Sequence, residues 1–446
     1  MTTALFMVAV LLTNGNFADL DGKGRPVGWT MDRTHWSVAK SAAKDGANAL
    51  VWTNADPNVR VTAMQPIRLE HGKMYSLDYD IRIDGRLCGD AKGGASAYVE
   101  YYGENGKWLS GTYGDVYKKT DDAWIHVCKI SGEIPTNAVS YRVGLTANKG
   151  LTGRASFANV CVREFELPAA WDPVKARYRY ADGQTHGRRV WIDRERRCIV
   201  DGKPFFPLGF YGGGGHMELI GKSPFNTLML YGAPGRAKLD EARRNGLMVI
   251  SGVNHFPLTP EGDATLAEYV RSVKDHPALL AWYAFDEAPI TEVPRWEKRR
   301  DLLEKLDDDH PVWGVMNHPT WTGQQLGMFD VGGADPYPVP NEPLEQCTSW
   351  TENVVRRTGR RRAVWMVPQA FNWANYDRPF GRVPTREELR TMTRLCLDAG
   401  ATGIIYFKFG DLLNNAKSPS TTFESRWADL VAVAEEVRVR LETGIR

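Results

Sequence analysis

From residue 205 onward, short apolar runs alternate with amphipathic stretches, and this alternation restricts the fold more than any other feature. Eight apolar runs cover residues 205–211, 226–232, 247–255, 279–287, 311–317, 329–338, 363–371 and 402–411. The stretches between them, including residues 237–246, 263–276, 294–310, 342–357 and 385–400, repeat their apolar side chains at helical spacing. Eight strand–helix units over about 245 residues predict a (β/α)8 barrel. A doubly wound sheet fits less well, because the glycines at residues 212–215 lack nucleotide-loop spacing.

The first part of the chain has a different pattern. Short alternating segments at residues 75–83, 96–102, 124–130 and 140–145 are separated by Gly, Asp and Asn. This pattern is typical of antiparallel strands in a two-sheet sandwich. We therefore predict an α/β protein in which a jelly-roll β-sandwich (residues 1–168) precedes a TIM barrel (residues 204–446). Residues 169–203 are expected to be a linker and a β-hairpin whose turn is Asp201-Gly202-Lys203.

Two segments of the predicted sandwich resemble jelly-roll carbohydrate-binding modules. Residues 11–30 (LLTNGNFADLDGKGRPVGWT) are similar to the first strand and loop of such modules, and residues 150–165 (GLTGRASFANVCVREF) to their last loop and strand. The resemblance implies sugar stacking by exposed aromatic rings, for which the candidates are Trp29, Trp36, Trp52, Trp108 and Tyr113. The alternative is that these rings fill the sandwich, which then only braces the barrel.

Composition excludes several classes of partner. The chain has 56 basic and 54 acidic residues and no block of like charge, so neither nucleic acid nor a membrane surface is expected as a partner. The six cysteines show no metal-ligand spacing, and no metal or cofactor is predicted; Cys128 and Cys161 could bridge two strands. Residues 5–12 are apolar but too short to span a membrane, and are either the remnant of a secretion signal or a first strand. A secreted or periplasmic location is expected because the inferred substrate is extracellular.

Polar and aromatic residues follow every predicted barrel strand, at the end where barrel enzymes carry their sites. In strand order they are Tyr211, Tyr231, Asn254, His255, Asp286, Glu287, Asn317, His318, Asp335, Tyr337, Gln369, Asn372, Trp373, Lys408 and Asp411. A ring rich in acids, amides and aromatic residues suits an uncharged, polyhydroxylated ligand, so a glycan is the expected partner. Four further aromatic residues, Trp282, Trp313, Trp365 and Tyr406, lie within or beside the strands and are further candidates for binding it.

The run at residues 279–285 ends in two adjacent carboxylates, Asp286 and Glu287. Acids at the end of a buried strand lose hydration, which moves their pKa values apart, as acid–base catalysis requires. Strict alternation would point the two side chains to opposite faces, so we predict a twist or bulge where the strand ends. Asp335 is the main competing carboxylate. Asp330 is expected to be structural, and residues 307–309 are expected to form a solvated corner.

The segment FDEAP (residues 285–289) resembles the Asp-Glu motif of β-N-acetylhexosaminidases of glycoside hydrolase families 20 and 123, with one residue inserted before the proline. The resemblance implies substrate-assisted retention, in which the 2-acetamido group is the nucleophile. Glu287 would then be the general acid/base, Asp286 would stabilise the acetamido group, and Tyr337 or Tyr406 would bind its oxygen. The closer likeness to family 123 favours N-acetylgalactosamine.

Two other functions remain open. The large superfamily of retaining barrel glycosidases carries its nucleophile as a Glu after strand 7, where this chain has Gln369. An enzyme acting on a sugar without an acetamido group would therefore pair Glu287 with Asp335. A polysaccharide-binding protein without catalytic activity is the remaining class, although two desolvated acids argue against it.

Overall fold

The computed structural model describes residues 11–89, 93–132, 134–376, 381–414 and 420–444. The chain divides into two compact units, residues 1–167 and residues 168–446, each with its own core. Most of the apolar segment at residues 5–12 lies outside the described residues. Among the described residues, no helix has the length and apolar character needed to cross a membrane.

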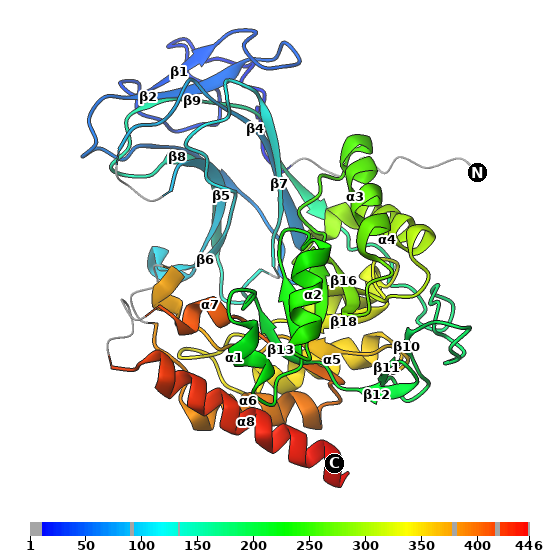
Figure 1. Ribbon diagram of the computed structural model, residues 1–446. Helices are drawn as coiled ribbons and strands as arrows, with labels where there is room; N and C mark the ends of the chain where they lie inside the picture. Colours follow the sequence, from blue (N-terminus) through cyan, green and yellow to red (C-terminus); the bar gives the residue numbers. More distant parts are fainter. Residues whose placement is uncertain (1–10, 90–92, 133, 377–380, 415–419, 445–446) are drawn as a thin grey trace. The chain divides into compact units, whose positions relative to one another are not determined.

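The first unit is an antiparallel sandwich (Figure 1). A five-stranded sheet has the order β1 (Trp36–Ala39), β2 (Ala49–Asn54), β9 (Gly153–Phe165), β4 (Met74–Ile83) and β7 (Ile125–Ile130). A four-stranded sheet has the order β3 (Thr62–Ile67), β8 (Ser140–Ala147), β5 (Ala95–Tyr102) and β6 (Trp108–Tyr113), with the short helix η1 (Glu104–Gly106) between β5 and β6. The predicted two-sheet sandwich is confirmed. Three candidate stacking residues, Trp29, Trp36 and Trp52, lie in its core.

The second unit contains eight parallel strands: β13 (Leu208–Tyr211), β14 (Thr227–Leu230), β15 (Met248–Gly252), β16 (Leu279–Asp286), β17 (Val312–Met316), β18 (Val331–Ala334), β19 (Trp365–Met366) and β20 (Gly403–Tyr406). Strands β18 and β19 end the sheet order, and a parallel bridge between Gly332 and Val364 joins them. The sheet therefore closes on itself, and the predicted (β/α)8 barrel is confirmed in all eight strands.

Helices follow the strands: α1 (Met217–Gly221), α2 (Arg236–Arg244), α3 (Pro260–Val273), η2 (Ile290–Glu292) with α4 (Val293–Leu306), η3 (Pro319–Gln325), α5 (Gln346–Arg357), η4 (Trp373–Tyr376) with α6 (Arg386–Asp398), and α7 (Phe409–Leu412) with α8 (Phe423–Thr443). Local signals begin two of them. Thr259 caps α3 and precedes Pro260, and Thr385 forms a capping box with Glu388 at α6. Only the 3-10 helix η3 follows β17, so the fifth strand–helix pair of the barrel has no α-helix.

Residues 168–203 belong to the barrel unit and close the N-terminal ends of its strands. The hairpin is present as β10 (Val190–Ile192), β11 (Cys198–Val200) and β12 (Lys203–Phe205). Side chains of this segment, including Tyr180 and Ile192, join the barrel's core cluster. Arg179 ion-pairs with Asp330, which also pairs with Arg300 of α4. Asp330 is therefore structural, as predicted, and the expected linker is a packed floor of the barrel.

Candidate active site

A bulge at the end of β16 brings both acids to the mouth of the barrel. Tyr283 faces the barrel interior. The register against β17 shifts between Tyr283 and Phe285, and the Phe285 ring packs outward against Trp296 of α4. This shift reverses the alternation, so Asp286 returns to the inner side. The predicted bulge is confirmed.

Glu287 turns the chain immediately after the strand. Its φ is 49°, in the left-handed region that non-glycine residues seldom occupy, while its backbone N–H still donates to Val315 O at 2.9 Å. Asn317, at the end of the neighbouring strand, donates from Nδ2 to Glu287 Oε2 at 2.8 Å. Strained backbone of this kind persists where the surroundings hold it, and it is concentrated at functional sites.

Asp335, after β18, is the third carboxyl of the cluster. It is 5% exposed, it lies beside Glu287, and its Oδ1 has no hydrogen-bond partner among the described residues. Burial raises the pKa of Asp335 well above its ordinary value, and the neighbouring Glu287 carboxyl raises this pKa further. A buried carboxyl beside a second carboxyl favours its protonated form.

Asp286 has a different environment. Asp286 is exposed as a residue, but the surrounding protein removes water from its carboxyl group. This desolvation raises the pKa of Asp286. The Tyr283 hydroxyl lowers that pKa and the Glu287 charge raises it. Tyr211 and Tyr231 lie close enough to Asp286 for its charge to raise their pKa values too, although burial is the larger cause. Asp286 thus faces three tyrosines, whereas Glu287 faces an amide and a carboxyl.

Aromatic side chains in the barrel interior lie beneath the acids. Trp313 lies with its ring centroid 5.8 Å from Tyr211, 5.0 Å from Tyr283 and 5.9 Å from Trp365. Trp313 and Trp365 are fully buried, so they support the site from below. Tyr231 packs against Tyr211 at 5.9 Å and is 47% exposed, which leaves its ring available at the mouth.

Residues after β18, β19 and β20 build one wall. The Tyr337 ring lies 6.1 Å from Trp373 and 5.7 Å from Phe407. The Lys408 ammonium lies 5.3 Å from the centre of the Tyr376 ring and 3.9 Å from Asp411 Oδ2. Tyr376 donates to that same Asp411 oxygen at 2.7 Å. This wall combines flat apolar faces with fixed polar groups.

Several predicted residues stand outside the cluster. Trp282 is buried and donates to Asp307 Oδ2 at 2.8 Å. Asp307 is itself buried and pairs with His310, so the expectation of a solvated corner is wrong for Asp307. Tyr406 is buried with its hydroxyl 2.6 Å from Thr393 of α6, which places it behind the barrel wall. Trp282 and Tyr406 therefore do not line the mouth, because both point from their strands toward the helices.

The Gln369 side chain hydrogen-bonds to backbone groups. Its side-chain amide accepts from Val339 N at 2.9 Å and donates to Val339 O and to Phe371 O. It joins the loops after β18 and β19 and is fully buried. Near the mouth, Asn254 is half-buried, His255 is exposed and stacks on Phe256, and Asn372 is buried. Burial lowers the pKa of His318, and Glu287 opposes that shift.

Four contributors were missed from the sequence: Tyr376 and Phe407 of the wall, Tyr283 and Asn375. Tyr283 stands inside the FDEAP-bearing strand, but only the phase of the bulge shows that it faces inward. Asn375 donates to Asp411 Oδ1 at 2.9 Å from the short helix η4, and no periodic signal marks that helix.

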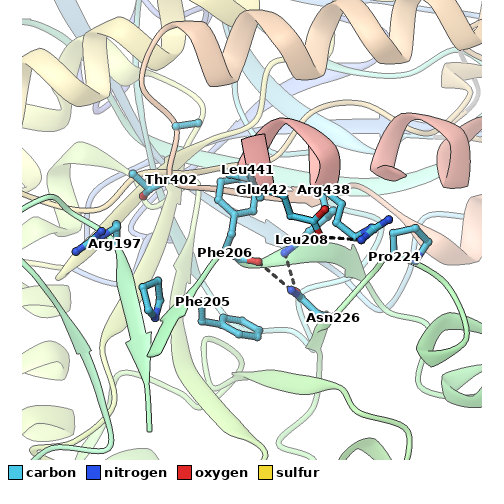
Figure 2. A pocket seen from close by; sticks show the side chains of 12 residues that line it. Arg197, Phe205, Phe206, Leu208, Pro224, Asn226, Thr402, Arg438, Leu441 and Glu442 are labelled. Carbon is cyan, nitrogen blue, oxygen red and sulfur yellow. Dashed lines mark hydrogen bonds and ion pairs between the residues drawn. The ribbon is translucent and has the colours of Figure 1, made fainter. Parts of the chain in front are cut away.

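A cavity of about 660 Å³ lies at the opposite end of the barrel (Figure 2). Its lining comes from the starts of β13 and β14, from the hairpin and from α8. Figure 2 shows that Asn226 bridges two backbone groups, accepting from Leu208 N at 2.9 Å and donating to Phe206 O at 3.0 Å. Arg438 pairs with Glu442. These polar groups are satisfied by one another, and the cavity is remote from the acids.

Fold and site together define a barrel with three clustered carboxyls at the C-terminal ends of its strands. No family model matches the chain, and no curated protein does. Solved structures show similarity at low identity. A β-glucuronidase from an uncultured Clostridium species is 11% identical over 92% of this chain and 98% of its own, with a TM-score of 0.42. The CBM22-1–GH10 modules of Clostridium thermocellum xylanase 10B, complexed with xylohexaose, are 11% identical over 96% and 97%, with a TM-score of 0.36.

Bacteriophage CBA120 tailspike protein 4 is also similar, at 12% identity and a TM-score of 0.27. The match covers 35% of this chain and spans about a fifth of the tailspike chain. At these identities and TM-scores, the activity has to be argued from the site itself.

Proposed function

We propose that this protein is a glycoside hydrolase, and specifically an exo-acting β-N-acetylhexosaminidase that retains configuration by substrate assistance. The observation that carries the proposal is the acidic cluster at the barrel mouth, in which Asp286 and Glu287 are adjacent and Asp335 is buried beside Glu287. Aromatic faces beneath and beside the cluster fit the C–H faces of a sugar ring.

The spacing of the acids argues against a protein nucleophile. Retaining glycosidases hold their two carboxyls about 5–5.5 Å apart, and inverting enzymes about 6.5–9.5 Å apart, so that the anomeric carbon fits between them. Asp335 is buried directly beside Glu287, so these two carboxyls do not flank a space for that carbon. The β19 end offers Gln369, whose amide is occupied by backbone. The substrate's own 2-acetamido oxygen can act as the nucleophile in place of a protein carboxylate.

The roles then follow from the two environments. Glu287 protonates the leaving oxygen as the acetamido oxygen attacks the anomeric carbon and the glycosidic bond breaks. It then removes a proton from the water that opens the oxazoline. Asp286 accepts the acetamido N–H and stabilises the positive charge that develops there. We lean toward N-acetylgalactosamine, because the motif is closer to family 123.

Variant kinetics test these roles. We expect Glu287→Gln to lower kcat on an aryl β-N-acetylhexosaminide by about 10²–10⁴-fold with little change in ligand affinity. Asp286→Asn should be comparably severe, because it removes acetamido stabilisation. Glu268→Gln, at an exposed position of α3, is the matched control and should retain most of the turnover. If Glu287→Gln kept its turnover, the proposal would be wrong.

Rescue by azide distinguishes substrate assistance from a mechanism in which Asp335 is the nucleophile. An external nucleophile restores turnover where a carboxylate nucleophile has been removed. If Glu287 paired with Asp335 on a plain glycoside, azide would rescue Asp335→Ala on that substrate and Asp286→Asn would be mild.

A further inference from the structure

Two of the five candidate stacking residues of the sandwich are exposed, and they lie together. Trp108 is 50% exposed and Tyr113 is 48% exposed, whereas Trp29, Trp36 and Trp52 are buried. Trp108 Nε1 donates to the Tyr113 hydroxyl at 3.2 Å, so the two rings belong to one surface. Both are on β6, the edge strand of the four-stranded sheet.

A bulge produces this pairing. Trp108 and Tyr113 are five residues apart, and strict alternation would place them on opposite faces. The register between β5 and β6 skips Leu109, because Tyr101 pairs with Ser110 while Tyr102 pairs with Trp108. The extra residue brings both rings to the face that does not cover the core.

Glycines let aromatic rings lie flat on that face. A Cβ at Gly111 would stand 3.0 Å from the Tyr113 ring, and a Cβ at Gly144 would stand 2.2 Å from the Tyr98 ring. The Tyr98 and Tyr113 rings are 5.9 Å apart. Tyr98 is only 4% exposed, so it supports Tyr113 from below, and the exposed aromatic faces are those of Trp108 and Tyr113.

A polar network borders the rings. Tyr113 donates to Glu100, which pairs with Arg142 at 3.1 Å. Tyr102 donates to Glu100, and the Arg142 guanidinium lies 4.2 Å from the centre of the Tyr102 ring. The two charges of this network neutralise each other and leave hydroxyls, a carboxylate and a guanidinium at the rim. Such groups hydrogen-bond sugar hydroxyls without selecting a charge.

We propose that this surface, defined by Glu100, Tyr102, Trp108, Tyr113 and Arg142, binds a neutral polysaccharide chain. The exposed rings of Trp108 and Tyr113 stack on pyranose faces, and the polar rim accepts from and donates to hydroxyls. The surface belongs to the first unit, and its binding does not depend on the proposed hydrolysis.

Depletion of the full-length chain by insoluble cellulose, xylan and chitin tests the proposal. Every binding variant also carries Glu287→Gln, so that hydrolysis does not consume the polymer during the assay. Trp108→Ala and Tyr113→Ala should each weaken binding to at least one of these polymers by about tenfold, and Trp108→Phe should restore part of it. Trp171→Ala is the matched control, because Trp171 is 49% exposed but lies in the second unit.

Three outcomes overturn the proposal. They are unchanged binding in the Trp108→Ala/Tyr113→Ala double variant, binding confined to an anionic polymer such as polygalacturonate, and binding abolished by a thiazoline inhibitor that occupies the barrel. Thermal unfolding of each variant confirms that a loss of binding is not a loss of fold. Because binding is measured without turnover, failure here leaves the proposed activity standing, and failure of that activity leaves this test intact.

Discussion

At the scale of single residues, the unusual feature is a buried carboxyl that lies beside a second carboxyl. Asp335 is buried beside Glu287 and carries an unpartnered oxygen. Burial and the neighbouring negative charge raise the pKa of Asp335, so the folded state binds a proton that the unfolded chain releases near pH 4. Its stabilising contribution is complete below the unfolded pKa and is lost as pH rises through the folded pKa. The site therefore costs stability at neutral pH.

Asp335→Asn follows from this linkage. Asparagine can still donate to Glu287 but never ionises, so the variant should gain about 1–3 kcal/mol of stability relative to the native chain, with the gain increasing above pH 4. Turnover should fall, because Glu287 loses the ionisable carboxyl beside it. Unfolding free energies and kcat/KM measured across pH check both effects. A variant that is destabilised equally at every pH would contradict the raised pKa of Asp335.

At the scale of elements, the position of the acids depends on the β16 bulge and on the strand beside it. Gly314 of β17 lies under the outward-facing Phe285 ring, and a Cβ there would stand 2.0 Å from that ring. The glycine lets Phe285 face the helices and Asp286 face the barrel.

Gly314→Ala should therefore destabilise the fold by about 1–3 kcal/mol and reduce turnover, because Phe285 must shift and Asp286 moves with it. Gly215→Ala is the matched control, since its added methyl meets nothing within 4 Å. Denaturant unfolding and kcat measured on both variants test this. Equal stability of the two would show that Phe285 does not depend on Gly314.

Periodicity predicts the elements well and the direction of side chains less well. All eight strands could be found from apolar runs, and adjacent acids at a strand end implied a bulge. The phase of that bulge is set by tertiary packing of Phe285, so sequence could not tell that Tyr283 faces the site while Trp282 faces α4. Tyr406 was misplaced for the same reason. Gln369 resembled a ligand-binding residue because Val339, which both accepts from and donates to its side chain, lies in a loop distant in sequence.

At the scale of the barrel unit, the segment at residues 168–203 is held by a buried charge cluster. Arg179 and Arg300 both pair with Asp330, whose carboxyl is fully buried. Burial alone would raise the pKa of Asp330, but the two guanidinium groups hold it well below its ordinary value. The contribution of Asp330 to stability is present above the unfolded pKa near 4 and is lost as pH falls through the folded pKa.

Asp330→Asn should cost about 3–5 kcal/mol, because two buried cations lose their partner. Asp308→Asn is the control, since Asp308 is 69% exposed in its pair with Arg188 and should change stability by about 1 kcal/mol or less. Thermal unfolding at pH 7 compares them. A small effect of Asp330→Asn would mean that the segment at residues 168–203 is held by packing alone.

The most direct test of the account is hydrolysis of aryl β-N-acetylgalactosaminide, β-N-acetylglucosaminide, β-galactoside and β-glucoside, with and without a thiazoline inhibitor. We predict turnover confined to the two N-acetyl sugars, faster on the galacto compound and blocked by thiazoline. Turnover of the plain galactoside or glucoside, insensitive to thiazoline, would contradict substrate assistance and make Asp335 the second catalytic carboxyl.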